Sequence, residues 1–461
     1  MPSPINIRLL CTTDEHGFLE RADRIQAFIE RTKAANPGST LVVSCGDVYE
    51  GAAVSELEGH KTALQLLDVY DVVTTGNHDF AKGKSFLTRW ANQSRYDILS
   101  ANVEDSSTHG LVQGLKASTI KEAGGFKIGF LGVVTQEAGK LNRAEDVTGL
   151  DFHDPIPAAQ KSVKELRDNG ADIVIALTHL TPEEDQRFVA QVEGVDWNLG
   201  GHTHESYKKP QTSGLHPFAK AGYARTGVVQ LDLMIDPITR KLVDYDYQLI
   251  SAKGLPDPPP ESPATAMVAS ANSRVDAALQ TPVARSLQEL PHTKDDSSPI
   301  LCFAGEQILQ QTGADVVFFD RGQIRHGLPT QEVSVGQLLD IAPFQTKLVS
   351  VDLSRERLKE ILQRSNQRTD NSRLHVSGVD CSGEPRLADG RDLPETVHVV
   401  TTTYLAKGNA GYLTADEAPA RREWPVIRDF LETALSLNNP SERPSVAKVL
   451  SDAGLSLRTP R

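Results

Sequence analysis

The chain has 461 residues, of which 39% are hydrophobic and 24% are charged, and its formal net charge is −13. This length exceeds one ordinary hydrophobic core, so we expect two domains of about 200 residues each. The acidic balance argues against a nucleic-acid partner, because such proteins neutralise phosphates with many lysines and arginines. A small anionic ligand remains compatible with it, since a few cations can invert the local potential.

The N-terminal residues MPSPINIRLL contain neither a basic leader nor an apolar stretch followed by a cleavage site. No apolar run is long enough for a transmembrane helix, so we expect no membrane association. The four cysteines are scattered, without a CxxC pair, which favours reduced thiols. We therefore expect a cytoplasmic protein; a periplasmic or secreted one is the alternative if a leader has been removed.

The first half of the chain alternates short apolar runs with amphipathic stretches. INIRLLCTT predicts a strand, ERADRIQAFIERTKAAN predicts a helix with Ile25, Phe28 and Ile29 on one face, and TLVVSCGD predicts the next strand. Further strands are predicted at DVVTTGNHD, YDILSAN, FKIGFLGVV, DIVIALTH, VDWNLGGH, GVVQLDLMID and LVDYDYQLI. This alternation predicts an α/β domain over residues 1–252.

A proline-rich segment, PDPPPESP, follows at residues 256–263. Proline lacks the amide donor and fixes φ, so this segment cannot continue a strand or a helix. We expect a linker with a bridging helix over residues 253–282. Residues 283–461 again mix strand runs (ADVVFFD, TKLVSVDL, TVHVVTTTYL) with helices such as RERLKEILQRSN, which predicts a second α/β domain.

Polar side chains that can bind metals come at or just after the ends of several predicted strands. Because strand ends gather at one edge of an open α/β sheet, we expect them to converge at one edge of the first sheet. A lone histidine there is usually a surface residue and a lone aspartate usually a helix cap. Seven such residues in order are much harder to explain in that way. They are Asp14, His16, Asp47, Asn77, His179, His202 and His204.

A mixed set of imidazole, carboxylate and amide ligands favours a transition metal, which leaves Zn, Mn, Fe and Co open. A carboxylate such as Asp47 has two oxygens, so it can bridge two ions about 3.5–4 Å apart. Bridged ion pairs acidify a bound water and offset negative charge on a phosphoryl group. The pattern therefore predicts a two-metal site suited to phosphoester hydrolysis.

The strings TTDEHG, SCGDVYEG, TTGNHDF, ALTHL and GGHTHE resemble, in order, the five signature blocks of the calcineurin-like metallophosphoesterases. The resemblance implies a four-layer α/β/β/α catalytic domain. It also implies that Asp14, His16, Asp47 and His204 hold one divalent ion and that Asp47, Asn77, His179 and His202 hold the other. Asn77 and His78 would be the catalytic residues, with His78 acting on the leaving oxygen or stabilising the transition state.

The second half resembles the C-terminal domain of the 5′-nucleotidase, 2′,3′-cyclic phosphodiesterase and UDP-sugar hydrolase family, through FFDRGQIRHGLPTQEVSVGQLLDIAPFQTKLVSVDLSRERLKEIL and TTTYLAKGNAGY. In that family this domain binds the leaving group. By position, Arg325 would contact the anionic substrate, a role suited to a planar guanidinium. Tyr404 would stack on a nucleobase. The alternative for Tyr404 is a core strand residue.

The chain departs from this family's pattern at several positions. Where a second aromatic would sandwich the base, the sequence has Arg373, Leu374 and His375. Ala410 replaces the acidic residue of the glycine-rich motif, and Asp320 replaces an asparagine. These changes weaken the case for nucleotide specificity.

The acid that commonly orients the catalytic histidine lies three residues after it, where this chain has Ala81. Asp79 is adjacent to His78, so either turnover is slow or another group orients the histidine.

We therefore expect an enzyme that hydrolyses a small-molecule phosphoester, most simply a nucleotide, through a hydroxide that the two ions generate and that attacks phosphorus in line. A phosphodiesterase, a pyrophosphatase or a hydrolase of a non-nucleotide phosphoester is the first alternative. A metal-loaded sensor that binds a ligand without turnover is the second.

Overall fold

The computed structural model describes residues 3–142, 144–293, 297–368, 373–414, 422–436 and 444–456. The chain divides into two compact units, Met1–Ser273 and Arg274–Arg461, and each has its own hydrophobic core. Among the described residues, no helix combines the length and the apolar character needed to cross a membrane.

The first unit contains a six-stranded sheet in the order β14-β13-β1-β2-β3-β4. Strands β1 to β4 run parallel, and β13 and β14 extend the sheet in antiparallel pairing. The strands are β1 (Ile5–Thr12), β2 (Thr40–Ser44), β3 (Val72–Thr74), β4 (Asp97–Leu99), β13 (Gly227–Ile235) and β14 (Leu242–Ser251).

A second sheet in this unit has five strands in the order β12-β11-β10-β8-β7, all parallel except β7. Its strands are β7 (Ser118–Ala123), β8 (Phe126–Val134), β10 (Ile173–His179), β11 (Trp197–Gly200) and β12 (Phe218–Lys220). A small three-stranded sheet consists of β5 (Val103–Asp105), β6 (Gly110–Leu111) and β9 (Leu150–Phe152).

The two large sheets pack face to face. Alternate residues of β1, namely Ile7, Leu9 and Cys11, join one core cluster with Phe130 of β8 and Ile175 of β10. Because successive strand side chains point to opposite faces, the intervening residues of β1 face away from the other sheet. The six-stranded sheet therefore buries one face against the five-stranded sheet and the other against helices.

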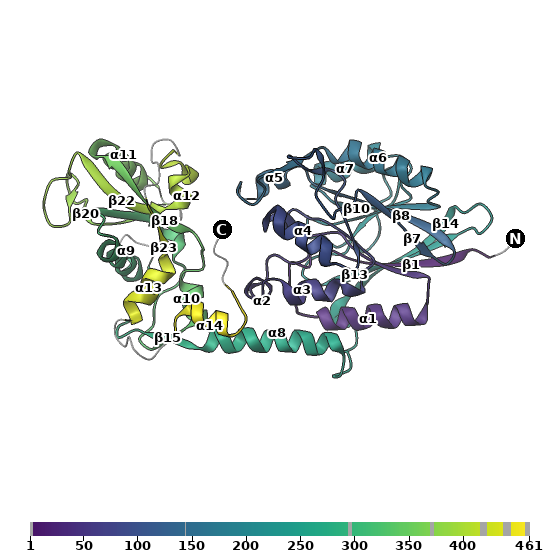
Figure 1. The fold of residues 1–461 in the computed structure, drawn as a ribbon, viewed down its shortest axis with the longest axis horizontal. Helices are drawn as coiled ribbons and strands as arrows, with labels where there is room; N and C mark the ends of the chain where they lie inside the picture. The colour runs from purple at the N-terminus through teal and green to yellow at the C-terminus, as the bar shows by residue number, and fades with distance from the viewer. Residues whose placement is uncertain are drawn as a thin grey trace. The chain divides into compact units, whose positions relative to one another are not determined.

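Helices cover both outer faces. Ile25 of α1 (Ala22–Ala35) and Trp90 of α4 (Gly83–Gln93) pack with Leu10 of β1. Val163 of α6 (Pro155–Asp168) and Phe188 of α7 (Pro182–Gln191) pack with the outer face of the second sheet. In Figure 1, α6 and α7 lie on one side of the paired sheets and α1 lies on the other. The predicted α/β/β/α layering is confirmed. The remaining short helices are α2 (Ala53–Leu57), α3 (Lys61–Gln65) and α5 (Ala138–Leu141).

Asp97, at the start of the edge strand β4, is held by two lysines and a threonine. Its carboxylate accepts hydrogen bonds from Lys116 at 2.7 Å and Thr119 at 2.7 Å, and it lies 2.8 Å from Lys121 Nζ. Burial alone would raise the pKa of Asp97, but these partners outweigh it and lower the pKa to about 2. The ionised form of Asp97 therefore stabilises the first unit.

We expect Asp97→Asn to lower the free energy of unfolding by about 1 kcal/mol at pH 7, because hydrogen bonds from charged donors are lost at a partly exposed site. A depressed folded-state pKa contributes stability above the unfolded value of about 3.9. That contribution is lost as pH falls toward 2, so the gap between wild type and variant should close there. Urea unfolding at pH 7 and pH 2.5 measures it. Asp168→Asn, which breaks an exposed pair with Lys164, is the control with little effect, and an equal loss in both variants would contradict the prediction.

Helix α8 (Pro263–Gln280) follows the proline-rich segment, and the division between the two units falls within it, after Ser273. Ala264 and Ala271 of this helix pack against Leu19 and Leu66 of the first unit. The domain limits at residues 252 and 283 stay a prediction.

The second unit is built on a five-stranded mixed sheet in the order β19-β16-β22-β18-β23, which confirms the predicted second α/β domain. Its strands are β16 (Val316–Asp320), β18 (Lys347–Ser354), β19 (Leu374–Ser377), β22 (Thr396–Thr402) and β23 (Arg422–Val426). Two-stranded sheets join β15 (Pro282–Arg285) to β17 (Glu332–Ser334) and β20 (Val379–Asp380) to β21 (Arg386–Leu387). The helices are α9 (Pro299–Thr312), α10 (Val335–Ile341), α11 (Arg355–Asn366), α12 (Thr403–Ala406), α13 (Ile427–Ser436) and α14 (Val446–Asp452).

Candidate metal centre

The predicted metal ligands lie beyond the ends of five strands in the first unit. Asp14 and His16 follow β1, Asp47 follows β2, and Asn77 follows β3. His179 ends β10, and His202 and His204 follow β11, which belongs to the other sheet. The expectation that all seven residues sit at the edge of a single sheet is therefore wrong. Two face-to-face sheets each contribute ligands, and sequence order did not reveal which strands pair.

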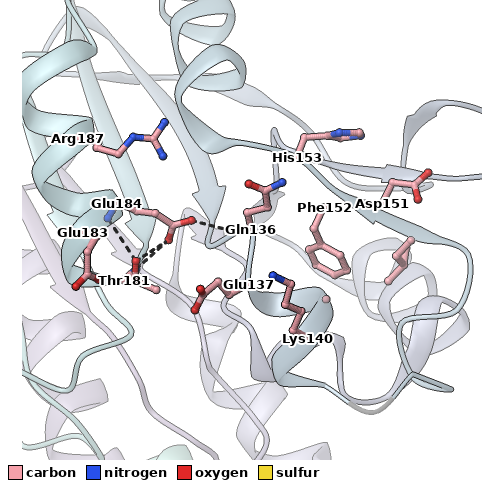
Figure 2. A pocket seen from close by; sticks show the side chains of 12 residues that line it. Gln136, Glu137, Lys140, Asp151, Phe152, His153, Thr181, Glu183, Glu184 and Arg187 are labelled. Carbon is pink, nitrogen blue, oxygen red and sulfur yellow. Dashed lines mark hydrogen bonds between the residues drawn. The ribbon is translucent and has the colours of Figure 1, made fainter.

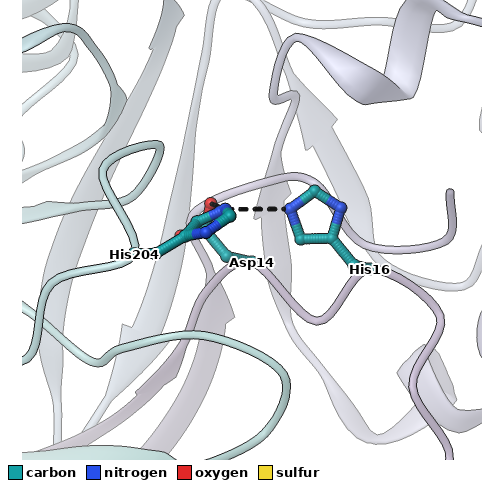
Figure 3. A group of neighbouring side chains, drawn as sticks. All are labelled: Asp14, His16 and His204. Atoms are coloured by element: carbon teal, nitrogen blue, oxygen red, sulfur yellow. Dashed lines mark hydrogen bonds and ion pairs between the residues drawn. The ribbon is translucent and has the colours of Figure 1, made fainter. Parts of the chain in front are cut away.

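One group consists of Asp14, His16 and His204, whose ligand atoms all lie within 4.8 Å of one another (Figure 3). His16 Nε2 is 3.2 Å from His204 Nε2, and His204 Nε2 is 3.6 Å from Asp14 Oδ1. Asp14 is fully buried, and Thr13 Oγ1 and the His202 amide both donate hydrogen bonds to its carboxylate. These three side chains can hold one cation.

A second group consists of Asp47, His179 and His202, with the same mutual spacing of ligand atoms. Asp47 Oδ2 lies 3.1 Å from His179 Nε2 and 3.5 Å from His16 Nε2, which belongs to the first group. The Asp47 carboxylate therefore lies beside histidines of both groups. A carboxylate in this position could bridge two cations.

In two of the candidate ligand histidines, a backbone carbonyl group fixes which ring nitrogen carries a proton. His16 Nδ1 lies 2.8 Å from the Glu50 carbonyl oxygen, and His179 Nδ1 lies 2.6 Å from the Cys45 carbonyl oxygen. A carbonyl can only accept, so each Nδ1 carries a proton, and when the ring is neutral the lone pair lies on Nε2. This arrangement is common in metal sites, where it fixes the tautomer and the ring orientation. Cys45 is fully buried and contributes its backbone carbonyl here.

Asn77 provides the clearest sign that the cluster is built for an added group. Its side chain is buried, and among the described residues its Oδ1 has no hydrogen-bond partner. Asn142 Nδ2 donates to the Asn77 carbonyl at 2.8 Å, so the backbone is held in place. An unsatisfied buried polar oxygen costs about 1–3 kcal/mol unless a ligand satisfies it. An amide oxygen suits a divalent cation, so the residues present fit the metals that were predicted.

Backbone conformation is unusual at this cluster. Left-handed φ angles are rare outside glycine and cost of order 1–3 kcal/mol each, and they concentrate at functional sites. Five of the seven predicted ligands have them, with φ of 50° at Asp14, 47° at His16, 56° at Asp47, 77° at His202 and 60° at His204. The loops therefore direct these side chains inward at the expense of local backbone energy.

Two glycines allow the ligand loops to approach each other. A Cβ at Gly76 would lie 2.1 Å from Asp47 Oδ1, and a Cβ at Gly201 would lie 2.3 Å from Thr13 Oγ1 and 2.9 Å from Asp14 Oδ2. Real Cβ atoms do not approach so closely, so these positions require glycine. The glycines in TTGNHDF and GGHTHE thus have a steric role beside the ligands.

The titratable groups of the cluster have pKa values that are shifted in different directions. Burial raises the pKa of Asp14 to about 7, and His179 offsets part of that effect. Burial would also raise the pKa of Asp47, but the charge of His179 outweighs it and holds the pKa well below its usual range. Burial, then the charge of His179, lowers the pKa of His202 to about 3, and burial also lowers the pKa of His16. Neutral imidazole is the form that binds metals.

The predicted catalytic residue His78 lies at the edge of the cluster. Its ring is 4.9 Å from the His16 ring, and its side chain is 47% exposed. Ligand atoms of His16, Asp47 and His78 also lie within 4.8 Å of one another. His78 is thus close enough to act on a molecule at the cluster while remaining accessible.

The adjacent Asp79 does not contact the His78 ring through its carboxylate. That carboxylate accepts hydrogen bonds from the amides of Asp47, Val48 and Gly76 at 2.8–3.0 Å. Glu50 Oε2, in contrast, lies 3.2 Å from His78 Nδ1 and is the first cause of a pKa of about 9 for His78. Sequence reasoning missed Glu50. It stands in SCGDVYEG, but no spacing rule links it to a histidine 28 residues later.

Sequence reasoning also missed Tyr223. Its ring stacks on the ligand His204 with centroids 4.1 Å apart and an interplanar angle of 21°. The His204 side chain is 43% exposed, whereas His16 and His179 are nearly buried. Because Ala224 N donates to the Asp14 carbonyl at 2.8 Å, the Tyr223 loop is tied to the first ligand loop. Tyr223 thus restricts the motion of the His204 ring, which is the most exposed of these three histidine side chains.

In the second unit, Arg325 lines a cavity of about 530 Å³ with Glu289, His292 and His326. Its guanidinium carbon lies 5.2 Å from the centroid of the Phe344 ring. Tyr404 is 45% exposed and lies in the short helix α12. The alternative that Tyr404 is a core strand residue is therefore wrong.

The positions that depart from the family pattern are also visible in this unit. Leu374 and His375 are buried, and His375 packs beside Phe319 with ring centroids 5.3 Å apart. Arg373 is partly exposed and its carbonyl accepts from the Arg321 amide. Ala410 has a left-handed φ of 59°. Beside Arg373, therefore, Leu374 and His375 are buried, and neither presents an exposed aromatic face to a base.

A cavity of about 770 Å³ in the first unit lies between the start of α7, α5 and β9 (Figure 2). Thr181 and Glu184 form a capping box at the start of α7, and Glu184 also accepts from the Gln136 amide at 3.1 Å. The cavity lining includes none of the seven predicted ligands. Donor chemistry, and not this cavity, therefore points to the candidate metal centre.

Comparison with known families agrees with this architecture. Residues 7–206 match the family described as calcineurin-like phosphoesterase, and residues 275–417 match the 5′-nucleotidase C-terminal domain. The first match contains all seven predicted ligands, and the second contains Arg325 and Tyr404.

Similar proteins include the trifunctional nucleotide phosphoesterase protein YfkN of Bacillus subtilis, which is 24% identical over 90% of this chain. The chain spans only 32% of YfkN but 88% of the protein UshA of Yersinia enterocolitica, to which it is 22% identical. Two solved structures share the fold. They are a putative 5′-nucleotidase from Staphylococcus aureus (TM-score 0.67, 17% identity, covering 96% of this chain and 98% of that one) and a 5′-nucleotidase precursor from Thermus thermophilus (0.60, 21%, 94% and 97%). The first unit therefore contains a calcineurin-like phosphoesterase domain over residues 7–206, and residues 275–417 form a 5′-nucleotidase C-terminal domain.

Proposed function

We propose that this protein hydrolyses phosphoester bonds with two divalent ions held in the first unit. The observation that carries the proposal is the position of Asp47, whose carboxylate lies between two groups of metal-binding side chains. Asp14, His16 and His204 would complete one site, and Asn77, His179 and His202 the other. The mixed nitrogen and oxygen donors fit Zn, Mn, Fe or Co.

When bound, such a pair of ions supplies charge stabilisation for the phosphoryl group and lowers the pKa of the attacking water. The protein's own contribution is to hold the reacting groups in place. His78 is accessible beside His16, and Glu50 fixes its Nδ1 side, so Nε2 is free to donate a proton to the leaving oxygen. The buried Asn77 amide oxygen has no hydrogen-bond partner among the described residues, so it is available to bind an ion.

The substrate that we propose is a small phosphoester, most simply a nucleotide. Relatives named 5′-nucleotidase occur in Vibrio species, and the protein from Vibrio vulnificus is 28% identical over 41% of this chain. Arg325 would contact an anionic group of the substrate, and the exposed Tyr404 ring would stack on a planar leaving group. No nucleic acid or membrane partner is part of this proposal, since the net charge is −13.

A second candidate is a hydrolase with a broader or different leaving-group preference, including phosphodiesters or non-nucleotide esters. It is favoured by the buried Leu374 and His375, which leave β19 without an aromatic face for a base. One relative, from Haemophilus influenzae, is named 2′,3′-cyclic-nucleotide 2′-phosphodiesterase/3′-nucleotidase. The metal centre would be the same, and only the second unit would differ in what it accepts.

We also propose a cytoplasmic location. No disulfide joins the cysteines at positions 11, 45, 302 and 381, all of which lie among the described residues, as expected in a reducing compartment.

Substrate profiling after metal removal tests the proposed function. We expect phosphate release from a nucleoside monophosphate to fall at least about 100-fold after chelation and to return with added Mn²⁺ or Zn²⁺, because the ions supply several kcal/mol of charge stabilisation. The panel should include a 2′,3′-cyclic nucleotide, a UDP-sugar and p-nitrophenyl phosphate. Preference for the last would favour the second candidate. A protein that contains two ions and is inert on the whole panel would instead be a sensor.

A further inference from the structure

His78 has one acidic partner within hydrogen-bonding distance among the described residues, and it comes from a different loop. Glu50 Oε2 lies 3.2 Å from His78 Nδ1. The two other places where an orienting acid might stand are ruled out by geometry. Ala81 has no polar atom in its side chain, and the Asp79 carboxylate is occupied by three backbone amides. Glu50 is therefore the group that can fix the direction of the His78 ring.

Glu50 also contacts the metal cluster through its backbone. Its carbonyl oxygen lies 2.8 Å from Nδ1 of the ligand His16, and the His16 and His78 rings meet edge to face at 4.9 Å. One residue thus orients two neighbouring histidines, one with its main chain and one with its side chain. A substitution that alters only the Glu50 side chain separates the two roles.

The Glu50 side chain is itself held in place. Lys82 Nζ lies 3.6 Å from Glu50 Oε1 and 2.6 Å from Glu56 Oε2, and the Lys82 side chain is only 4% exposed. A nearly buried lysine between two carboxylates has little freedom to move, because its charge must stay paired. Lys82 therefore holds in place the Glu50 carboxylate that faces His78.

We propose that Glu50 is the positioning residue for His78, with Lys82 holding the Glu50 carboxylate toward the ring. This inference rests on the proposed function, in which His78 acts on the leaving oxygen. The Glu50 carboxylate accepts a hydrogen bond from the Nδ1–H group of His78, and Nε2 then points toward the substrate side of the cluster. The role is carried by a contact between separate loops and not by a residue that follows the histidine in the chain.

The test is a double-mutant cycle with Glu50→Gln and His78→Ala in the full-length, metal-loaded protein. Glutamine preserves the size of the side chain and the backbone carbonyl that contacts His16. We expect Glu50→Gln to lower kcat by about 10–100-fold with little change in KM, because a poorly oriented acid loses much of its general-acid effect. Glu50→Gln/His78→Ala should be no slower than His78→Ala alone, since Glu50 acts through the histidine.

Metal content by mass spectrometry should be the same in wild type and Glu50→Gln. The matched control is Glu20→Gln, an exposed glutamate bonded to Arg21, which should leave kcat unchanged. Additive losses in the cycle, or loss of metal in Glu50→Gln, would overturn the proposal. The first would mean that Glu50 acts independently of His78, and the second that its main effect runs through His16.

A second measurement does not depend on turnover, so it separates this inference from the proposed function. In proton NMR spectra of the folded protein, the Nδ1 proton of His78 should be visible and slow to exchange, because it is hydrogen-bonded. The resonance is assigned by its absence in His78→Ala. It should broaden or disappear in Glu50→Gln and persist in Glu20→Gln. A wild-type protein that is inert on every phosphoester would contradict the proposed function. An unchanged resonance in Glu50→Gln would contradict the role of Glu50.

Discussion

Asp47→Asn should remove bound metal and lower kcat/KM by more than about 10³-fold, because several kcal/mol of charge stabilisation would depend on this carboxylate if it bridges the two proposed ions. The asparagine can keep the Oδ1 contact that now accepts from the His78 amide at 2.8 Å. It places an amide nitrogen, which cannot bind a cation, where Asp47 Oδ2 faces His16 and His179. Loss of metal is thus expected without loss of the loop.

Metal analysis and steady-state kinetics measure this effect together. Asp68→Asn, at an exposed position of the same unit, is the control and should retain both ions and full activity. Circular dichroism should be similar for all three proteins. If Asp47→Asn keeps two ions per chain and turns over at the wild-type rate, the bridging role of Asp47 is wrong.

His78→Ala should show the opposite combination, with metal content retained and kcat lowered by about 10²–10⁴-fold, the usual range for loss of a general acid or base. His78 lies at the exposed edge of the cluster, and its partner is Glu50, so its removal leaves the seven ligands in place. Comparing kcat with metal stoichiometry distinguishes this variant from Asp47→Asn.

The control for His78→Ala is His109→Ala, at an exposed position of the same unit. It should change neither quantity. A His78→Ala protein that loses its metal would make His78 a ligand, a reading that its closeness to His16 and Asp47 allows. Activity within about threefold of wild type would remove His78 from the mechanism.

The candidate metal ligands stand out in the sequence because each lies at or just after the end of a strand that the apolar pattern reveals. The residues that orient them do not. Glu50 and Tyr223 reach the site from loops whose approach depends on how two sheets pack, and a one-dimensional pattern does not encode that pairing. For the same reason the sequence could predict the strands β1, β2, β10 and β11 but not that they form separate sheets.

Tyr404 illustrates a different limit. The run TVHVVTTTYL reads as one continuous strand, yet β22 ends at Thr402. The Thr402 hydroxyl accepts a hydrogen bond from the Leu405 amide at 3.2 Å and so begins a helix. A threonine that favours strands also caps helices well, so propensity alone cannot decide between these roles. The exposed position of Tyr404 follows from that cap.

The left-handed ligand residues have a consequence for how this protein can change. At roughly 1 kcal/mol or more each, five such residues represent a substantial part of the 5–15 kcal/mol that stabilises a typical domain. Glycine at any of them would relieve the backbone strain but would remove a metal-binding side chain. A mutation that stabilises the fold at these positions would therefore abolish activity. Selection or engineering for thermal stability alone would therefore replace these residues first, unless the protein were kept supplied with divalent cations.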